Sequence, residues 1–157
     1  MTISDIKYTS KDKAVVIDSL RDSTIWDCIT PRSSDIIIAS CYKSGTTLTQ
    51  QIVNLLIDGH DDFDNIHQLS PWVEEQCPED SLNQKIERIE KLPDRRLFKT
   101  HLPFDALPYY PDWKYISLFR DGRDVGISLF NHLHSFTEEG RRNSPVYPFD
   151  GCIPIWQ

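Results

Sequence analysis

Residues suited to binding a dense anion follow an apolar run near position 40. The segment Lys43-Ser44-Gly45-Thr46-Thr47 is separated by three residues from the apolar run 36–39, and residues with helical spacing follow it. A loop at a helix N-terminus presents backbone N–H groups, and this one adds a lysine and three hydroxyls. Gly45 lets the backbone approach an anion closely. The pattern predicts an anion-binding loop, although a plain capped helix start would have a similar sequence.

A second cluster combines a cation with a titratable ring. Lys99 and His101 lie two residues apart after a short apolar run, so both face the same side of a strand. A lone histidine is usually structural. At a strand end beside lysine-bearing loops, His101 is a candidate general base.

A third cluster begins at Arg120, which follows the largely apolar residues 113–119. Ser128 lies eight residues later, on a helix predicted to start after Gly122. We expect it on the face of that helix that is turned toward Arg120. An ion pair of Arg120 with Asp121 or Asp124 is the alternative role.

The elements that must position these residues alternate between strand and helix. We predict strands at residues 36–38, 96–100 and 113–119. Helices are predicted from about 48 to a stop at Gly59, over 82–92, from 122 to about 133, and as a weakly patterned lead-in over 9–29. This alternation indicates an α/β domain with a mainly parallel sheet. Ligands bind beyond the carboxyl ends of such strands, where all three clusters lie.

Composition limits the function classes. The 157 residues suffice for one domain, 1–157, and the net charge of −7 argues against a nucleic-acid surface. No apolar run reaches membrane-spanning length, so we expect a cytoplasmic protein with reduced cysteines. The cysteines and histidines lack metal-ligand spacing, and the acidic loop 58–64 lacks that of a calcium site, so no metal is expected.

Trp72 follows Ser70-Pro71 and is costly to expose, so it belongs either to the core or to a pocket wall. The acidic stretches near Asp61 and Glu74 are expected to be solvated surface, with a cationic acceptor as the alternative reading.

Three separated segments resemble the cytosolic-type sulfotransferase family, over roughly residues 35–134. The first, residues 40–48, resembles the family's Y-P-K-S-G-T-T-W motif. Residues 99–103 match its K-T-H-L-P segment, and residues 119–128 resemble its R-N-x-x-D-V-x-x-S motif. The resemblance implies a P-loop-like three-layer α/β/α fold. It also implies a sulfonate donor, 3′-phosphoadenosine 5′-phosphosulfate (PAPS), and a small-molecule acceptor with a hydroxyl or amine.

The resemblance also assigns roles by position. His101 would take the acceptor proton, Lys43 and Lys99 would neutralise charge, and Trp72 with His101 would contact the acceptor. Lys43, Ser44, Gly45, Thr46, Thr47 and Leu48 would hold the 5′-phosphosulfate side of PAPS, and Arg120 and Ser128 would hold its 3′-phosphate.

The sequence departs from the family pattern in three places. Tyr42 replaces a proline, and Leu48 replaces a tryptophan that stacks on adenine, which removes about 1–3 kcal/mol of stacking. A later R-K-G-x-x-G-x-W motif is absent from these 157 residues, so the fold is expected to be incomplete, or completed by a partner chain or by self-association. The alternatives to a sulfotransferase are a non-catalytic nucleotide-binding remnant or interaction protein and, less favoured, a P-loop nucleotide kinase.

Overall fold

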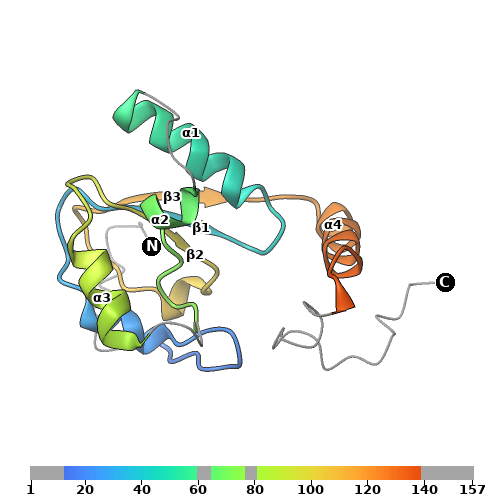
Figure 1. Ribbon diagram of the computed structural model, residues 1–157, viewed down its shortest axis with the longest axis horizontal. Helices are drawn as coiled ribbons and strands as arrows, with labels where there is room; N and C mark the ends of the chain where they lie inside the picture. The colour runs from blue at the N-terminus through green and yellow to red at the C-terminus, as the bar shows by residue number, and fades with distance from the viewer. Residues whose placement is uncertain (1–12, 60–64, 77–80, 139–157) are drawn as a thin grey trace, which may run out of the picture.

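A three-stranded parallel sheet forms the centre of the computed structural model, which describes residues 13–59, 65–76 and 81–138 (Figure 1). The strands are β1 (Ile36–Ser40), β2 (Leu97–Thr100) and β3 (Lys114–Leu118), in the order β2-β1-β3. Ile38 of β1 pairs with Lys99 on one side and with Ile116 on the other. The predicted α/β class and parallel sheet are confirmed.

The isoleucines of β1 face both sides of the sheet. Ile36 and Ile38 pack in a cluster with Val53 of the helix that follows β1. Ile37 points the other way, into a larger core that includes Phe98. Each face of β1 is therefore covered, which explains why the strand is apolar throughout rather than alternating.

Helices lie on both faces of the sheet (Figure 1). Helix α1 (Thr46–Asp58) covers one face. Helix α3 (Leu82–Glu90) and the 3-10 helix η2 (Ser23–Cys28) contribute to the core on the other face. The short elements α2 (Ile66–Leu69) and η3 (Phe104–Ala106) lie in connections, and α4 (Gly122–His134) follows β3 and stands beyond the end of the sheet.

The helix limits follow from local chemistry. Helix α1 ends at Gly59, which adopts φ 74° and donates its N–H to the Leu55 carbonyl, as the sequence predicted. Ser81 is the N-cap of helix α3, and its side chain forms a reciprocal capping box with Gln84. Among the described residues, no helix is both long enough and apolar enough to cross a membrane.

The lead-in helix predicted over 9–29 is wrong for the part that the structure describes. Residues 13–22 are irregular, with a bridge between Ile17 and Asp22, and only Ser23–Cys28 is helical, as a 3-10 turn. The Asp22 side chain accepts the Thr24 N–H and starts this turn. Trp26 then enters the core, so tertiary packing and a local cap replace the weak helical pattern.

The apolar stripe that predicted α1 faces away from the sheet. Leu48, Ile52, Leu55 and Leu56 are exposed, Leu56 by 79%. Val53 packs against the sheet, and the buried side of α1 also carries polar residues such as Gln50, whose Nε2 donates to the carbonyl and hydroxyl of Ser70.

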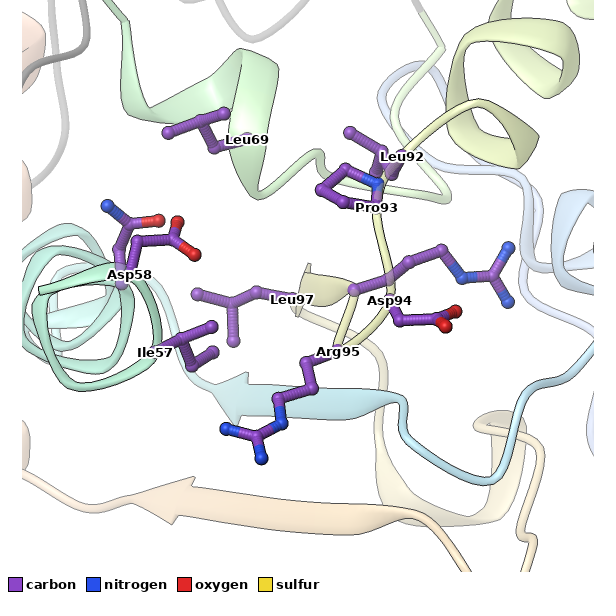
Figure 2. A pocket seen from close by; sticks show the side chains of 10 residues that line it. Ile57, Asp58, Leu69, Leu92, Pro93, Asp94, Arg95 and Leu97 are labelled. Atoms are coloured by element: carbon purple, nitrogen blue, oxygen red, sulfur yellow. The ribbon is translucent and has the colours of Figure 1, made fainter.

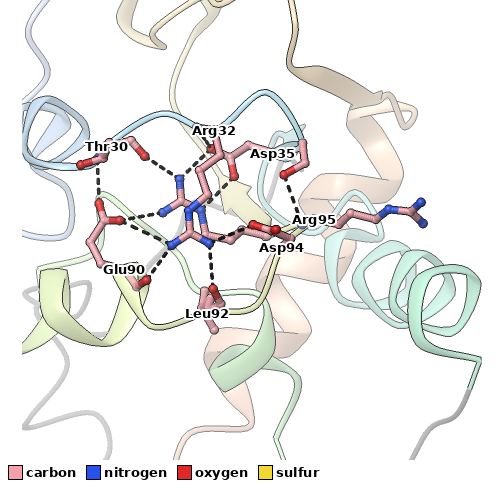
Figure 3. A network of polar contacts seen from close by, with 9 residues as sticks. Thr30, Arg32, Asp35, Glu90, Leu92, Asp94 and Arg95 are labelled. Atoms are coloured by element: carbon pink, nitrogen blue, oxygen red, sulfur yellow. Dashed lines mark hydrogen bonds and ion pairs between the residues drawn. The ribbon is translucent and has the colours of Figure 1, made fainter.

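A buried ion pair fastens the amino-terminal ends of β1 and β2 (Figure 3). Arg96 donates to both oxygens of Asp35 at 2.8 Å, and both side chains are fully buried. Arg96 also donates to the Thr30 carbonyl and to Glu90 at the end of α3. A cavity of about 30 Å³ lies nearby, where Ile57 and Asp58 of α1 face Leu69 and Leu97 (Figure 2). Both features lie at the end of the sheet opposite the predicted site.

Candidate active site

A cavity of about 700 Å³ opens at the carboxyl ends of the three strands. It brings together Lys99 of β2 and residues of the segments that follow β1, β2 and β3, as the strand-end pattern predicted. Ten of the predicted site residues line it: Lys43, Gly45, Thr46, Thr47, Leu48, Trp72, Lys99, His101, Arg120 and Ser128. Ser44 belongs to the same loop but is not among the residues that line the cavity.

The loop after β1 forms a turn of left-handed backbone around the start of α1. Lys43 has φ 60° and Gly45 has φ 96°. Gly45 is the N-cap of α1 and offers no side-chain cap, so the first N–H groups of the helix are left for an external acceptor. The hydroxyls of Ser40 and Thr46 lie 2.6 Å apart and join the strand end to the helix start. Backbone N–H groups and the helix dipole therefore favour an anion here.

His101 is held as a neutral imidazole with one nitrogen available. Its Nδ1 lies 2.8 Å from the Ser40 carbonyl oxygen, which can only accept, so Nδ1 carries the proton. Burial lowers the pKa of His101 to about 4, with the Ser40 carbonyl opposing that shift. Nε2 is therefore unprotonated at neutral pH, as a general base requires.

Lys99 is fixed beside the same histidine. Its Nζ lies 4.8 Å from the centre of the Trp72 ring, and its backbone N–H donates to the Pro71 carbonyl. Burial lowers the pKa of Lys99, while Glu75 and Glu74 oppose that shift. A cation over an indole face is stabilised by the ring quadrupole, so Lys99 is oriented before any ligand arrives.

Arg120 ties the end of β3 to the loop after β1. Its Nη1 donates to the Lys43 carbonyl at 2.8 Å. Asp121, one of the two ion-pair partners considered for Arg120, instead pairs with Arg123 at 2.6 Å. Ser128 lines the cavity from α4.

Tyr42, which stands where the family motif has proline, packs against the candidate base. Its ring centre lies 4.4 Å from that of His101 and 6.0 Å from that of Trp72. Trp72 is half-buried and lines the cavity, so the pocket-wall alternative describes its position. The Tyr42 hydroxyl is buried with no hydrogen-bond partner among the described residues, and burial raises its pKa.

Several residues of the site were missed by sequence reasoning. Leu20 and Arg21 come from the irregular N-terminal segment, and Arg21 donates to the His101 carbonyl at 3.0 Å. Nothing in their local sequence marks them. His67 and His132 also line the cavity, and burial lowers the pKa of both.

The expectation of a solvated surface is wrong for Glu74, which is fully buried behind the cavity. Asp61 lies outside the described residues.

The fold and the site define an α/β protein in which a loop with an uncapped helix start follows the central parallel strand, with a neutral histidine beside it. The chain belongs to the sulfotransferase domain family, which matches residues 33–150. It is 32% identical over 146 residues to the glycolipid sulfotransferase of Mycobacterium tuberculosis, covering 91% of this chain and 44% of the relative. It is 37% identical over 109 residues to dog sulfotransferase 1B1, covering 64% of this chain and 36% of that protein.

Solved structures share the fold. Retinol dehydratase in complex with androsterone and inactive cofactor PAP matches with a TM-score of 0.56 at 24% identity, over 71% of this chain and 42% of that one. Mouse sulfotransferase SULT7A1 complexed with PAP matches with a TM-score of 0.53 at 23% identity, over 83% and 41%. The chain thus spans less than half the length of these relatives.

Proposed function

We propose that this protein transfers a sulfonate group from PAPS to a hydroxyl or amine of a small-molecule acceptor. The observation that carries the proposal is the neutral His101 in one cavity with Lys43 and Lys99 and with an anion-binding loop. A base, two cations and backbone donors in a partly buried site are what in-line transfer between oxygens needs. Membership of the sulfotransferase family supports the same reaction.

The residues of the loop fit the donor nucleotide. The positive φ angles at Lys43 and Gly45 and the uncapped N-terminus of α1 form a cradle for the 5′-phosphosulfate. Arg120 and Ser128, on the β3 side of the cavity, would hold the 3′-phosphate. Leu48 lines the cavity in place of the family's tryptophan, so it would pack against adenine with an aliphatic side chain. When bound, PAPS supplies the activated sulfonate. The structures that share this fold were solved with PAP, the nucleotide that PAPS leaves after transfer.

The chain's own residues would act on protons and charge. His101 Nε2 would take the acceptor proton, since Nδ1 is already committed to Ser40. Lys99, fixed over Trp72, and Lys43, in the loop, would neutralise charge on the sulfonate and on the leaving phosphate oxygen. Fixed charges in a partly dry site need no reorganisation as the reaction proceeds, which is why they are effective.

The walls of the cavity favour an acceptor with an apolar body. Leu20, Trp72, Leu129 and Phe136 line it together with His101, so the reacting group would sit at the polar end. The mycobacterial relatives are named glycolipid sulfotransferases, which fits an acceptor of this kind.

Substitution of His101 tests the proposal. We expect His101→Ala to lower turnover by about 10²–10⁴-fold, the usual contribution of a positioned base. Calorimetric affinity for PAP should change little, because the nucleotide contacts lie on the loop and on Arg120. His134→Ala is the matched control, since His134 lies on α4 and is not among the residues that line the cavity. Equal losses of turnover and PAP affinity in His101→Ala would refute the assignment of His101 as the base. PAP binding without turnover in the wild-type chain would favour a non-catalytic nucleotide-binding remnant.

A further inference from the structure

A fully buried carboxylate lies directly behind the candidate active site. Glu74 has no exposed surface and is not among the residues that line the cavity. Its Oε1 accepts from the Trp72 indole at 2.6 Å, the His101 backbone N–H at 2.7 Å and the Thr100 hydroxyl at 2.9 Å. Its Oε2 accepts from the Trp26 indole at 3.1 Å. Two indoles, a hydroxyl and a peptide therefore converge on one side chain.

The donors to Glu74 are all neutral. A buried carboxylate costs several kcal/mol unless hydrogen bonds compensate for the loss of water, and here each oxygen is bonded. An apolar side chain of similar size would avoid that cost but would leave these four donors without an acceptor. The arrangement therefore favours a role that depends on acceptor oxygens at these positions rather than on packing volume.

The oxygen with three donors controls the groups that face the cavity. Holding the Trp72 indole fixes the ring on which Lys99 lies, and the same ring meets His101 edge-on, with ring centres 4.9 Å apart. Glu74 also holds the N–H of the His101 peptide, while Arg21 holds its carbonyl. One carboxylate thus sets the orientation of the cation, the aromatic wall and the base.

We propose that Glu74 is a positioning residue for sulfonate transfer, which holds His101 and Trp72, and through Trp72 the ammonium of Lys99, in their reactive arrangement. This proposal rests on the proposed function. Glu74 touches neither nucleotide nor acceptor in this role, and its oxygens act only through the residues that they hold.

Three variants separate positioning from charge. Glu74→Gln keeps the shape but places an amide N–H₂ against at least one of the N–H or O–H donors. Glu74→Asp keeps the charge but shortens the side chain by one methylene, so it cannot reach all four donors. Glu75→Gln is the matched control, because Glu75 is the adjacent, exposed carboxylate and also supports the charge on Lys99. A role in positioning predicts that Gln and Asp at position 74 behave alike, whereas a role of charge alone predicts that Asp behaves as wild type.

Readouts that do not need turnover keep this test apart from the proposed function. We expect the ¹H–¹⁵N indole resonances of Trp72 and Trp26 to move in both Glu74 variants. Labelling of His101 by diethylpyrocarbonate, resolved by mass spectrometry, should rise by about tenfold or more as the ring is released, since loosened local structure exposes its groups. Affinity for PAP, measured by calorimetry, should stay within about twofold, because Glu74 does not contact the nucleotide. Glu75→Gln should change none of these.

Turnover with PAPS supplies the second arm. For Glu74→Gln we expect kcat to fall by about 10–100-fold with the KM for PAPS little changed, as a small displacement of a reacting group does. Thr100→Val removes one donor to Glu74, and with it the acceptor of the Leu102 N–H, while it keeps the side-chain volume. It should give a smaller change of the same kind, and it carries the test if Glu74→Gln does not fold. The proposal would be overturned if Glu74→Gln showed the same labelling of His101 and the same kcat as the wild type. If Glu74→Gln does not fold, the same result in Thr100→Val would overturn it. A wild-type chain without turnover would refute the proposed function alone, because the resonances and the labelling still decide the role of Glu74.

Discussion

Burial sets the protonation state of His101 and links it to stability. The folded protein lowers the pKa of His101 to about 4, whereas an unfolded histidine has its ordinary value of 6.5. The unfolded chain therefore binds a proton first as the pH falls. The contribution of His101 to folding is fully present above pH 6.5, is lost as the pH falls toward 4, and changes no further below that.

Folding stability should record this difference. Between pH 6.5 and 4 the wild type should lose about 3 kcal/mol more than His101→Gln, which does not titrate. Urea unfolding of both proteins across this range measures the difference, and the carboxylates, common to both, cancel. Parallel pH profiles would show that His101 is not buried as a neutral ring.

One buried and one exposed arginine–aspartate pair offer a matched comparison. Arg96→Met leaves the fully buried Asp35 without its cation and should destabilise the fold by about 3–5 kcal/mol. Arg123→Met removes a pair whose arginine side chain is 88% exposed, so its unfolding curve should match that of the wild type. Chemical denaturation of the two variants against the wild type checks both values. Similar losses would mean that burial does not govern these pairs.

At the scale of elements, two glycines predict opposite effects of the same substitution. Gly45 has φ 96°, a left-handed conformation, so Gly45→Ala should destabilise the loop by about 1–2 kcal/mol. Gly126 lies within α4 with nothing within 4 Å of an added Cβ, so Gly126→Ala should stabilise the helix by about 0.5–1 kcal/mol. Thermal unfolding of both variants measures the signs, and a shared sign would contradict the assigned backbone conformations.

The elements that the sequence predicted best are those with local signals. Apolar runs ending in polar clusters located β1, β2 and β3, and Gly59 located the end of α1, because strand ends and helix stops leave residue-level patterns. The rule that parallel strands bind ligands at their carboxyl ends then placed Lys43, His101 and Arg120 in one cavity.

Contacts between distant segments could not be predicted in the same way. Arg21 reaches His101 across 80 residues, and Glu74 meets Trp26 across 48 residues. A glutamate beside another glutamate reads as surface, and only the folded chain shows that one of the two is buried. The apolar stripe of α1 is the opposite case, because its spacing suggests a buried face whereas the structure leaves that face exposed. Helical spacing shows that a face is apolar but not what covers it.

At the scale of the whole molecule, a chain of net charge −7 gathers cations at one place. Lys43, Lys99 and Arg120 come from three separate strand ends and line a single cavity. The proposed anion site is therefore local, which is compatible with an acidic protein because binding depends on nearby charges and oriented N–H groups rather than on the net charge.

The stabilisation of the folded chain by added nucleotide should show whether the cavity prefers PAP or ATP–Mg²⁺. A ligand that binds only the folded state stabilises it by RT ln(1 + [L]/Kd), about 2.7 kcal/mol at a hundredfold excess over Kd. We expect PAP to raise the melting temperature and ATP–Mg²⁺ to raise it less at equal concentration, because Arg120 and Ser128, which line the cavity, are the residues that we propose hold the 3′-phosphate. Arg120→Ala should reduce the shift with PAP more than that with ATP–Mg²⁺, and Arg123→Ala, on the same segment but outside the cavity, should leave both unchanged. A larger shift with ATP–Mg²⁺ than with PAP would contradict the proposed PAPS site.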